Sequence, residues 1–181
     1  MTDKRVVAKQ APRFDMEALM PDGSFGRISL EMIMKKDKWT VLFFYPMDFS
    51  TVCPTEIIAF SDHYDAFRQL DAEIIGVSTD TIHSHRVWTE MDRDQKGIGS
   101  VNYPLAADPS HSVSRDYGVL IEEDGIALRG LFIISPEGEL VYAQVNHHNI
   151  GRNVSHTLHT LQALQTEGFC PADWEPGTKT L

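Results

Sequence analysis

The stretch from Trp39 to Pro46 constrains the fold more than any other part of the chain. Trp39 to Tyr45 is a compact run rich in aromatic and β-branched residues, which is the composition of a strand buried on both faces. Pro46 ends the predicted strand, because proline cannot donate a hydrogen bond to a sheet ladder. The rest of the fold is therefore expected to be organised around this strand.

A cysteine follows the strand after a short loop. Cys53 is one of only two cysteines, and a helical pattern begins at Pro54. Proline is favoured at the first helical position, so Cys53 is predicted to lie at or beside the N-cap. A thiol there faces unpaired N–H groups and the positive end of the helix dipole, and both favour the thiolate. We expect a reactive sulfur, although a small buried cysteine fits the position equally well.

The remaining predicted elements alternate between strands and helices. A turn at Pro21–Ser24 separates Phe14–Leu19 from Phe25–Leu30, which we interpret as a β-hairpin or an irregular pair. The other predicted elements are strands at Glu73–Ser78, Tyr103–Ala107, Leu128–Ser135 and Leu140–Val145, and helices at Ser29–Lys38, Pro54–Leu70, Thr81–Gln95, Ser110–Tyr117 and Val154–Thr166. This order predicts parallel strands joined by a crossover helix, followed by a hairpin at the sheet edge. It indicates an α/β, thioredoxin-like fold, with a central mixed β-sheet flanked by helices, an N-terminal β-hairpin addition and an irregular C-terminal tail.

The domain organisation is simple. The 181 residues contain no repeat, low-complexity tract or linker, so we expect one domain over residues 1–181. Its tail, about residues 168–181, has no hydrophobic periodicity. A hydrophobic content of 42% with 23% charged residues is typical of a soluble globular protein.

Charge and hydropathy exclude several partners. The net charge of −10 argues against nucleic acid and against an anionic membrane surface, since both need basic patches on the protein. No apolar segment follows the N-terminal residues, and no apolar run is long enough to cross a bilayer. We therefore expect no signal peptide, no membrane association and a cytoplasmic location.

The cysteines and histidines give no metal signature. Cys53 and Cys170 form neither a disulfide framework nor a CxxC pair, and in a reducing compartment a bond between them would be transient and catalytic rather than structural. The histidine pairs, His83/His85 and His147/His148, lack the spacing of a zinc site, and we interpret them as solvated surface residues. We predict no metal and no bound cofactor.

Several residues near Cys53 could assist a thiolate. The Ser50 hydroxyl is close enough in sequence to contact both the sulfur and a bound oxygen, although Ser50 could instead cap the helix. Pro46 shapes the loop and can shield the thiolate from water. Glu56, one turn into the helix, would by itself disfavour a thiolate, so a cationic partner is expected from elsewhere in the chain.

The candidates for that partner are Arg129 and Arg152, although each could also be an ordinary surface charge. No catalytic base such as a cysteine protease requires accompanies Cys53, and a site with cations and a hydroxyl suits an electrophile that needs no acyl chemistry. A peroxide O–O bond is one such electrophile. Attack would leave a sulfenic acid on Cys53, and Cys170 is the candidate thiol to convert it into a disulfide.

The segment Phe44–Glu56, FYPMDFSTVCPTE, resembles the active-site motif of the peroxiredoxins, in which a proline, a Thr or Ser and the peroxidatic cysteine have PxxxTxxC spacing. Further similarities lie at Gly76–Thr81, Arg129–Ile134, Gly151-Arg152 and Cys170–Trp174. They follow the family's order along almost the whole chain and resemble its typical two-cysteine, AhpC-like branch.

The resemblance implies a thiol peroxidase that reduces hydrogen peroxide and organic hydroperoxides in antioxidant defence. It implies Cys53 as the peroxidatic cysteine and Cys170 as the resolving cysteine on a partner subunit, within a homodimer that associates further into a decamer. The other implied site residues are Ser50 and Arg129, which bind and polarise the peroxide, Pro46, which shields the site, and Glu56 and Arg152, which form an ion-pair network with Arg129. The implied reductant is thioredoxin or a flavoprotein disulfide reductase. The helix at Pro54 must unwind locally, because a disulfide needs Cα atoms within about 7 Å.

Three departures from the family pattern matter. Ser50 stands where most members have threonine, the loop at Lys96–Gly99 only partly matches a Gly-Gly-Leu-Gly loop, and the chain stops at Leu181 without the C-terminal Tyr-Phe helix of oxidation-sensitive members. We therefore expect easy unfolding at Cys53 and resistance to overoxidation. An alternative function is a redox-regulated chaperone or peroxide sensor using the same disulfide, whereas general disulfide exchange is disfavoured by the missing CxxC.

Overall fold

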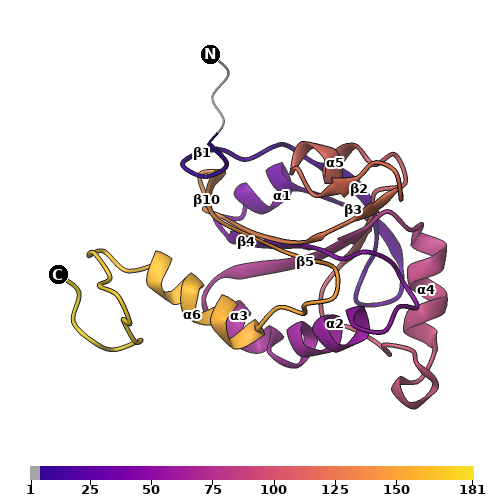
Figure 1. Cartoon of the computed structure of the whole chain (residues 1–181). Helices are drawn as coiled ribbons and strands as arrows, with labels where there is room; N and C mark the ends of the chain where they lie inside the picture. The colour runs from indigo at the N-terminus through magenta and orange to yellow at the C-terminus, as the bar shows by residue number, and fades with distance from the viewer. Residues whose placement is uncertain (1–4) are drawn as a thin grey trace.

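The computed structural model describes residues 5–181, and its centre is a mixed eight-stranded sheet with the order β1-β10-β9-β4-β5-β6-β2-β3 (Figure 1). The strands of this sheet are β1 Lys9–Gln10, β2 Asp15–Leu19, β3 Phe25–Ser29, β4 Trp39–Phe44, β5 Ala72–Ser78, β6 Leu105–Ala107, β9 Arg129–Ile134 and β10 Glu139–Asn146. A separate small hairpin pairs β7 Leu120–Ile121 with β8 Ile126–Ala127. The helices are α1 Leu30–Met34, α2 Cys53–Asp62, α3 Tyr64–Gln69, α4 Ile82–Glu90, α5 Ser112–Asp116 and α6 Val154–Leu164, with a 3₁₀ turn at Arg93–Gln95.

Strand β4 is the centre of the molecule, as its composition predicts. It pairs in parallel with β5 and antiparallel with β9. Val41 and Phe43 are buried in a core with residues of α2, α3 and α6, whereas Leu42 and Phe44 are buried on the other face in a core with residues of α1 and α5. Figure 1 shows these two helical layers on opposite faces of the sheet. Burial of each such side chain contributes about 1.5–3 kcal/mol, so the strand ending at the Cys53 loop is firmly held.

The predicted architecture is confirmed. The β4–α2–α3–β5 unit is the expected parallel crossover, and β9 and β10 form the expected antiparallel hairpin. The N-terminal hairpin, β2 with β3, is also present and joins the main sheet because β2 pairs antiparallel with β6.

The predicted helix from Pro54 to Leu70 is wrong as a single element. It is divided at His63, whose φ and ψ of −97° and 4° end α2 and begin α3. The His63 Nδ1 atom lies 2.8 Å from the carbonyl oxygen of Ala59, so the side chain bonds to the last turn of α2. The apolar stripe does not reveal the break, because Phe60 and Phe67 are buried in the same core on either side of it.

The predicted helix from Thr81 to Gln95 is also too long. Thr81 caps α4 by accepting a hydrogen bond from the Ser84 N–H, and the helix ends where Met91 adopts an extended conformation. The strands missing from the prediction, β1, β7 and β8, have two residues each. A strand this short has no room for the alternation by which strands are recognised in a sequence.

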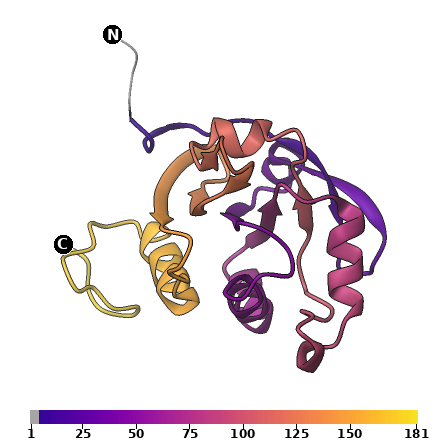
Figure 2. The ribbon, with the colours of Figure 1, turned by 45° about the vertical axis from the view of Figure 1, so that its right-hand side comes forward.

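The C-terminal tail contains no helix or strand, as predicted, but it is folded back on itself. The Leu181 N–H donates to the carbonyl oxygen of Phe169 at 2.9 Å, and Trp174 is buried beside His159 of α6. In Figures 1 and 2 the tail lies beyond the end of α6, outside the layers formed by the sheet and its helices. No helix in residues 5–181 is long and apolar enough to cross a membrane.

Candidate active site

Cys53 is the first residue of α2, which agrees with its predicted place at the helix start. The N-cap residue, Val52, makes no side-chain capping hydrogen bond, and Pro54 follows in the first turn. The Cys53 side chain is fully buried and its thiol is free. The helix therefore directs unpaired N–H groups and the positive end of its dipole toward a buried sulfur.

Arg129 of β9 contacts this sulfur directly. Its Nη1 atom donates to Cys53 Sγ at 3.3 Å and to Glu56 Oε2 at 2.5 Å, while its Nε donates to the carbonyl oxygen of His148 at 2.7 Å. Only 3% of the Arg129 side chain is exposed. Because a guanidinium group keeps its proton in proteins, this contact stabilises negative charge on the sulfur.

Arg152 provides the second cation of the site. Its backbone N–H and its Nε both donate to Glu56 Oε1 at 2.7 Å, and its Nη2 donates to Glu56 Oε2 at 3.0 Å. The Nη1 group donates to the carbonyl oxygens of Phe44 and Gly130, which fixes the guanidinium between β4 and β9. The cationic partner expected for Glu56 is thus present, and it consists of both candidate arginines.

The ion-paired side chains of this cluster carry a net positive charge. Arg129 and Arg152 bring two buried positive charges, whereas Glu56 brings a single negative charge. A buried charge without a counter-charge costs several kcal/mol. A thiolate on Cys53 makes the cluster neutral.

Ser50 and Pro46 lie in the loop before Cys53 and line a cavity of about 450 Å³ together with Val52 and Arg129. Ser50 Oγ is buried and has no hydrogen-bond partner among the residues that the structure describes. The alternative role of Ser50 as a helix cap is wrong, because Val52 occupies the N-cap position. The cavity is therefore lined both by Ser50 and by Arg129, the residue whose guanidinium group contacts the Cys53 sulfur.

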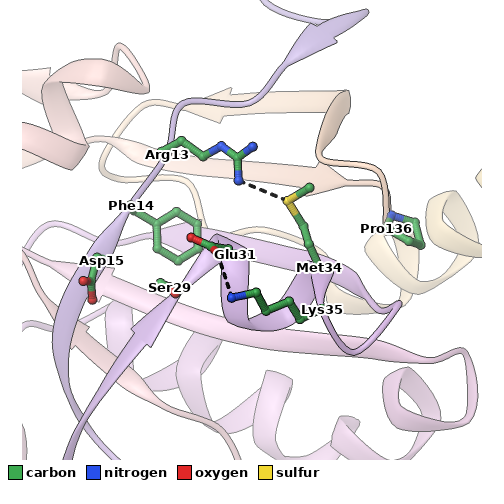
Figure 3. Close-up of a pocket in the computed structure, with 8 residues that line it drawn as sticks. All are labelled: Arg13, Phe14, Asp15, Ser29, Glu31, Met34, Lys35 and Pro136. Atoms are coloured by element: carbon green, nitrogen blue, oxygen red, sulfur yellow. Dashed lines mark hydrogen bonds and ion pairs between the residues drawn. The ribbon is translucent and has the colours of Figure 1, made fainter.

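A larger cavity of about 730 Å³ lies elsewhere, between α1 and the segment that precedes β2 (Figure 3). Its walls contain neither cysteine. The charged groups there are already paired or engaged: Glu31 bonds to Lys35 at 2.7 Å, and Arg13 donates to the sulfur of Met34 at 3.5 Å. Chemistry, rather than size, therefore makes the smaller cavity the candidate active site.

The structure does not bring Cys170 to Cys53 within one chain. Cys170 is a free, partly buried thiol whose Sγ lies 3.3 Å from Thr166 Oγ1 and 3.7 Å from the carbonyl oxygen of Ala163, at the C-terminal end of α6. The candidate active site lies at the other end of this helix, where Arg152 binds Glu56. The 11 residues of α6 span about 16 Å at 1.5 Å per residue, more than a disulfide can bridge.

The interpretation of His85 as a solvated surface residue is wrong. His85 is fully buried, with its Nδ1 2.8 Å from Asp48 Oδ2, whereas His83, His147 and His148 are exposed as expected. The sequence signal for burial was Trp88, three residues further along α4, because residues at this spacing share a helix face. No group of three His, Cys, Asp or Glu side chains in residues 5–181 could hold a metal ion.

Comparison with known proteins agrees with this geometry. The model of the AhpC/TSA family matches residues 7–143. The chain is 67% identical over 178 residues to "Putative peroxiredoxin YkuU" of Bacillus subtilis, covering 98% of this chain and 99% of that protein. It is 47% identical to the chloroplastic 2-Cys peroxiredoxin BAS1 of Spinacia oleracea, covering 99% of this chain and 68% of that protein.

Among solved structures, the reduced 2-Cys peroxiredoxin of Plasmodium vivax superposes with a TM-score of 0.93 at 37% identity, covering 97% of this chain and 92% of that one. The fold, the family match and the relatives agree. The chain belongs to the AhpC/TSA family and is a peroxiredoxin.

Proposed function

We propose that this peroxiredoxin reduces hydrogen peroxide and organic hydroperoxides through a Cys53 sulfenic acid and a disulfide between Cys53 and Cys170 of two subunits. The observation that carries the proposal is the contact of 3.3 Å between Arg129 Nη1 and Cys53 Sγ, in a cluster whose charge is balanced by a thiolate. Ser50 supports it as well, because it lines the adjoining cavity and its hydroxyl has no hydrogen-bond partner in residues 5–181.

In the first step the Cys53 thiolate attacks the terminal oxygen of the hydroperoxide. An S–O bond forms as the O–O bond breaks, so sulfur is oxidised by two electrons and becomes a sulfenic acid. The leaving oxygen takes a proton from solvent and departs as water or an alcohol. Ser50 and Arg129 would donate hydrogen bonds to the peroxide oxygens as charge moves onto them, and Pro46 would limit the access of water.

In the second step the Cys170 thiol of a partner subunit attacks the sulfenic sulfur, forming the disulfide and releasing water. The length of α6 supports a partner as the source, because it separates the two thiols of one chain. The first turn of α2 has to unwind, since the Cys53 sulfur is fully buried within it.

The sheet supports association with a second copy. Within residues 5–181, strand β1 pairs only with Leu140 and Glu139 at the start of β10, which leaves the rest of β10 as an open sheet edge. Val145 on this strand and Ile150 beyond it are apolar and about half exposed. Open edges favour strand pairing with another chain, so we infer a homodimer, which would associate further into a decamer.

A thioredoxin or a flavoprotein disulfide reductase would then return both thiols to the reduced state by supplying two electrons and two protons. We place this cycle in the cytoplasm, where reducing systems keep free thiols such as Cys53 and Cys170 available.

Peroxide consumption in the presence of thioredoxin, thioredoxin reductase and NADPH tests the proposal. Wild type should sustain turnover, Cys53→Ser should show none, and Cys170→Ser should oxidise once and then stop. Non-reducing gels should show a disulfide-linked dimer in wild type and in neither variant. Loss of turnover in Cys53→Ser alone, with no linked dimer in wild type, would refute the role of Cys170.

A peroxide sensor or redox-regulated chaperone predicts a different result in the same assay. Wild type would then be oxidised once per chain, with no sustained consumption when either reducing system is supplied. Such a result would replace the peroxidase proposal.

A further inference from the structure

A second buried polar cluster holds the other end of the loop that leads to Cys53. Asp48 is 4% exposed, and its carboxylate accepts hydrogen bonds from the Tyr45 hydroxyl at 3.0 Å and the Ser84 hydroxyl at 2.7 Å. Its Oδ2 also lies 2.8 Å from His85 Nδ1. Asp48 therefore joins the loop after β4 to helix α4.

His85 is satisfied on both sides of its ring. Its Nδ1 faces the Asp48 carboxylate, and its Nε2 faces the carbonyl oxygen of Ala106 on β6 at 3.3 Å. The two contacts hold the ring between the loop after β4 and strand β6. Burial, together with the nearby Asp48 charge, raises the pKa of Tyr45 well above its usual value, so this hydroxyl stays a donor.

The residue after Asp48 is conformationally strained. Phe49 has a φ of +57°, in the left-handed region that costs a residue with a side chain about 1–2 kcal/mol. Such a conformation persists only where the surroundings hold it. Here the Asp48 N–H donates to Asp80 Oδ2 at 2.9 Å, and the Phe49 ring packs on Trp88 with ring centroids 5.6 Å apart.

Ser50 lies between two fixed points. On one side Asp48 is bound to His85, and on the other Cys53 and Glu56 are bound to Arg129. The Ser50 hydroxyl has no hydrogen bond of its own within the described part of the chain. Its position is therefore set by the backbone at these two points.

We propose that His85 is a positioning residue for peroxide reduction. By holding Asp48 it fixes the left-handed turn at Phe49, and through that turn it sets where the Ser50 hydroxyl lies relative to Cys53 and Arg129. His85 itself does not touch the peroxide. The inference rests on the proposed attack of Cys53 on peroxide.

The test compares two reactions of the same sulfur in the reduced, full-length protein. Oxidation of Cys53 by hydrogen peroxide needs the aligned hydroxyl and guanidinium groups, whereas alkylation of Cys53 by iodoacetamide needs only an ionised, accessible sulfur. In His85→Leu the ratio of the peroxide to the alkylation rate constant should fall about 10-fold or more, since small misplacements in a site cost factors of this size. His85→Asn keeps an N–H donor at the place of Nδ1 and should restore part of the ratio.

His83→Leu is the matched control, because His83 is an exposed residue two positions earlier on α4 and packs on Phe25. Its ratio should stay within about 2-fold of wild type. Asp48→Asn supplies the same test if His85→Leu does not fold, and it should also lower the ratio.

A ratio in the His85 and Asp48 variants that equals that of wild type would overturn the inference, whether both rate constants stay unchanged or both fall in the same proportion. This result could occur while wild type reduces peroxide normally. Failure of the proposed function is distinct, because Cys53 of wild type would then not react with peroxide.

Discussion

Replacing Glu56 with glutamine removes the carboxylate charge that Arg129 and Arg152 share. All three side chains are at most 3% exposed, so solvent can compensate little of the loss. Breaking a buried ion pair by removing one partner costs about 3–5 kcal/mol. Glutamine keeps the shape of the side chain and one acceptor oxygen, and the arginines keep their backbone carbonyl partners. We therefore expect a loss of unfolding free energy at the low end of this range, about 3 kcal/mol. For a chain of this length, this loss lowers the melting temperature by about 6–12 °C.

Urea unfolding of the reduced protein measures this loss, at one fixed protein concentration because association also changes apparent stability. Glu31→Gln is the matched control. Glu31 bonds to Lys35 at 2.7 Å, the same distance as Glu56 to Arg152, but 65% of its side chain is exposed. This variant should show no measurable change. A Glu56→Gln variant as stable as Glu31→Gln would refute the view that burial makes the cluster hold α2 to β9.

Three further changes test other parts of the site. Ser50→Ala should leave the free energy of unfolding within about 0.5 kcal/mol of wild type, because the hydroxyl has no partner to lose in the described part of the chain. The same change should slow oxidation of Cys53 in stopped-flow measurements. Arg129→Leu should slow that oxidation about 10²–10³-fold, the usual cost of a lost charge-stabilising donor, and a change under 5-fold would contradict its role. Burial raises the pKa of Tyr103 well above its usual value. Above about pH 10 the unfolded chain therefore loses the Tyr103 proton while the folded chain keeps it. The free energy of unfolding consequently falls as the pH rises. Tyr103→Phe should flatten that fall in urea unfolding between pH 9 and 11, at a cost near neutral pH of about 1 kcal/mol for the bond to the Ile57 carbonyl.

The central strand and the place of Cys53 at a helix start could be predicted because their signals are local. A run of apolar residues ended by Pro46 describes β4, and Pro54 places Cys53 at the start of α2. The partners of Glu56 could be predicted for a different reason. A carboxylate close to a thiolate requires a counter-charge, and the arginines with the most ordered sequence contexts supplied it.

The features that sequence reasoning missed depend on contacts between distant segments. In the sequence, nothing distinguishes Asp48 from an ordinary loop residue. Its burial follows from the packing of α4, which places Ser84 and His85 against it. The spacing between His85 and its neighbouring histidine bears on a metal site and says nothing about burial. The break at His63 was hidden because a helix that stops and restarts can keep the same apolar face.

The charge of the Glu56 cluster also bears on how Cys53 leaves its helix. With a thiolate the two arginines are balanced, but a sulfenic acid on Cys53 is neutral and leaves one buried positive charge without a partner. The first turn of α2 is the weakest point of the helix, since Val52 makes no capping bond and Glu56 is the first side chain fixed by ion pairs. We therefore expect oxidation to loosen residues 50–55 while the helix beyond Glu56 stays folded. Amide hydrogen exchange of Cys170→Ser, before and after one equivalent of peroxide, measures this, and unchanged protection of residues 50–55 would show that charge does not couple oxidation to unwinding.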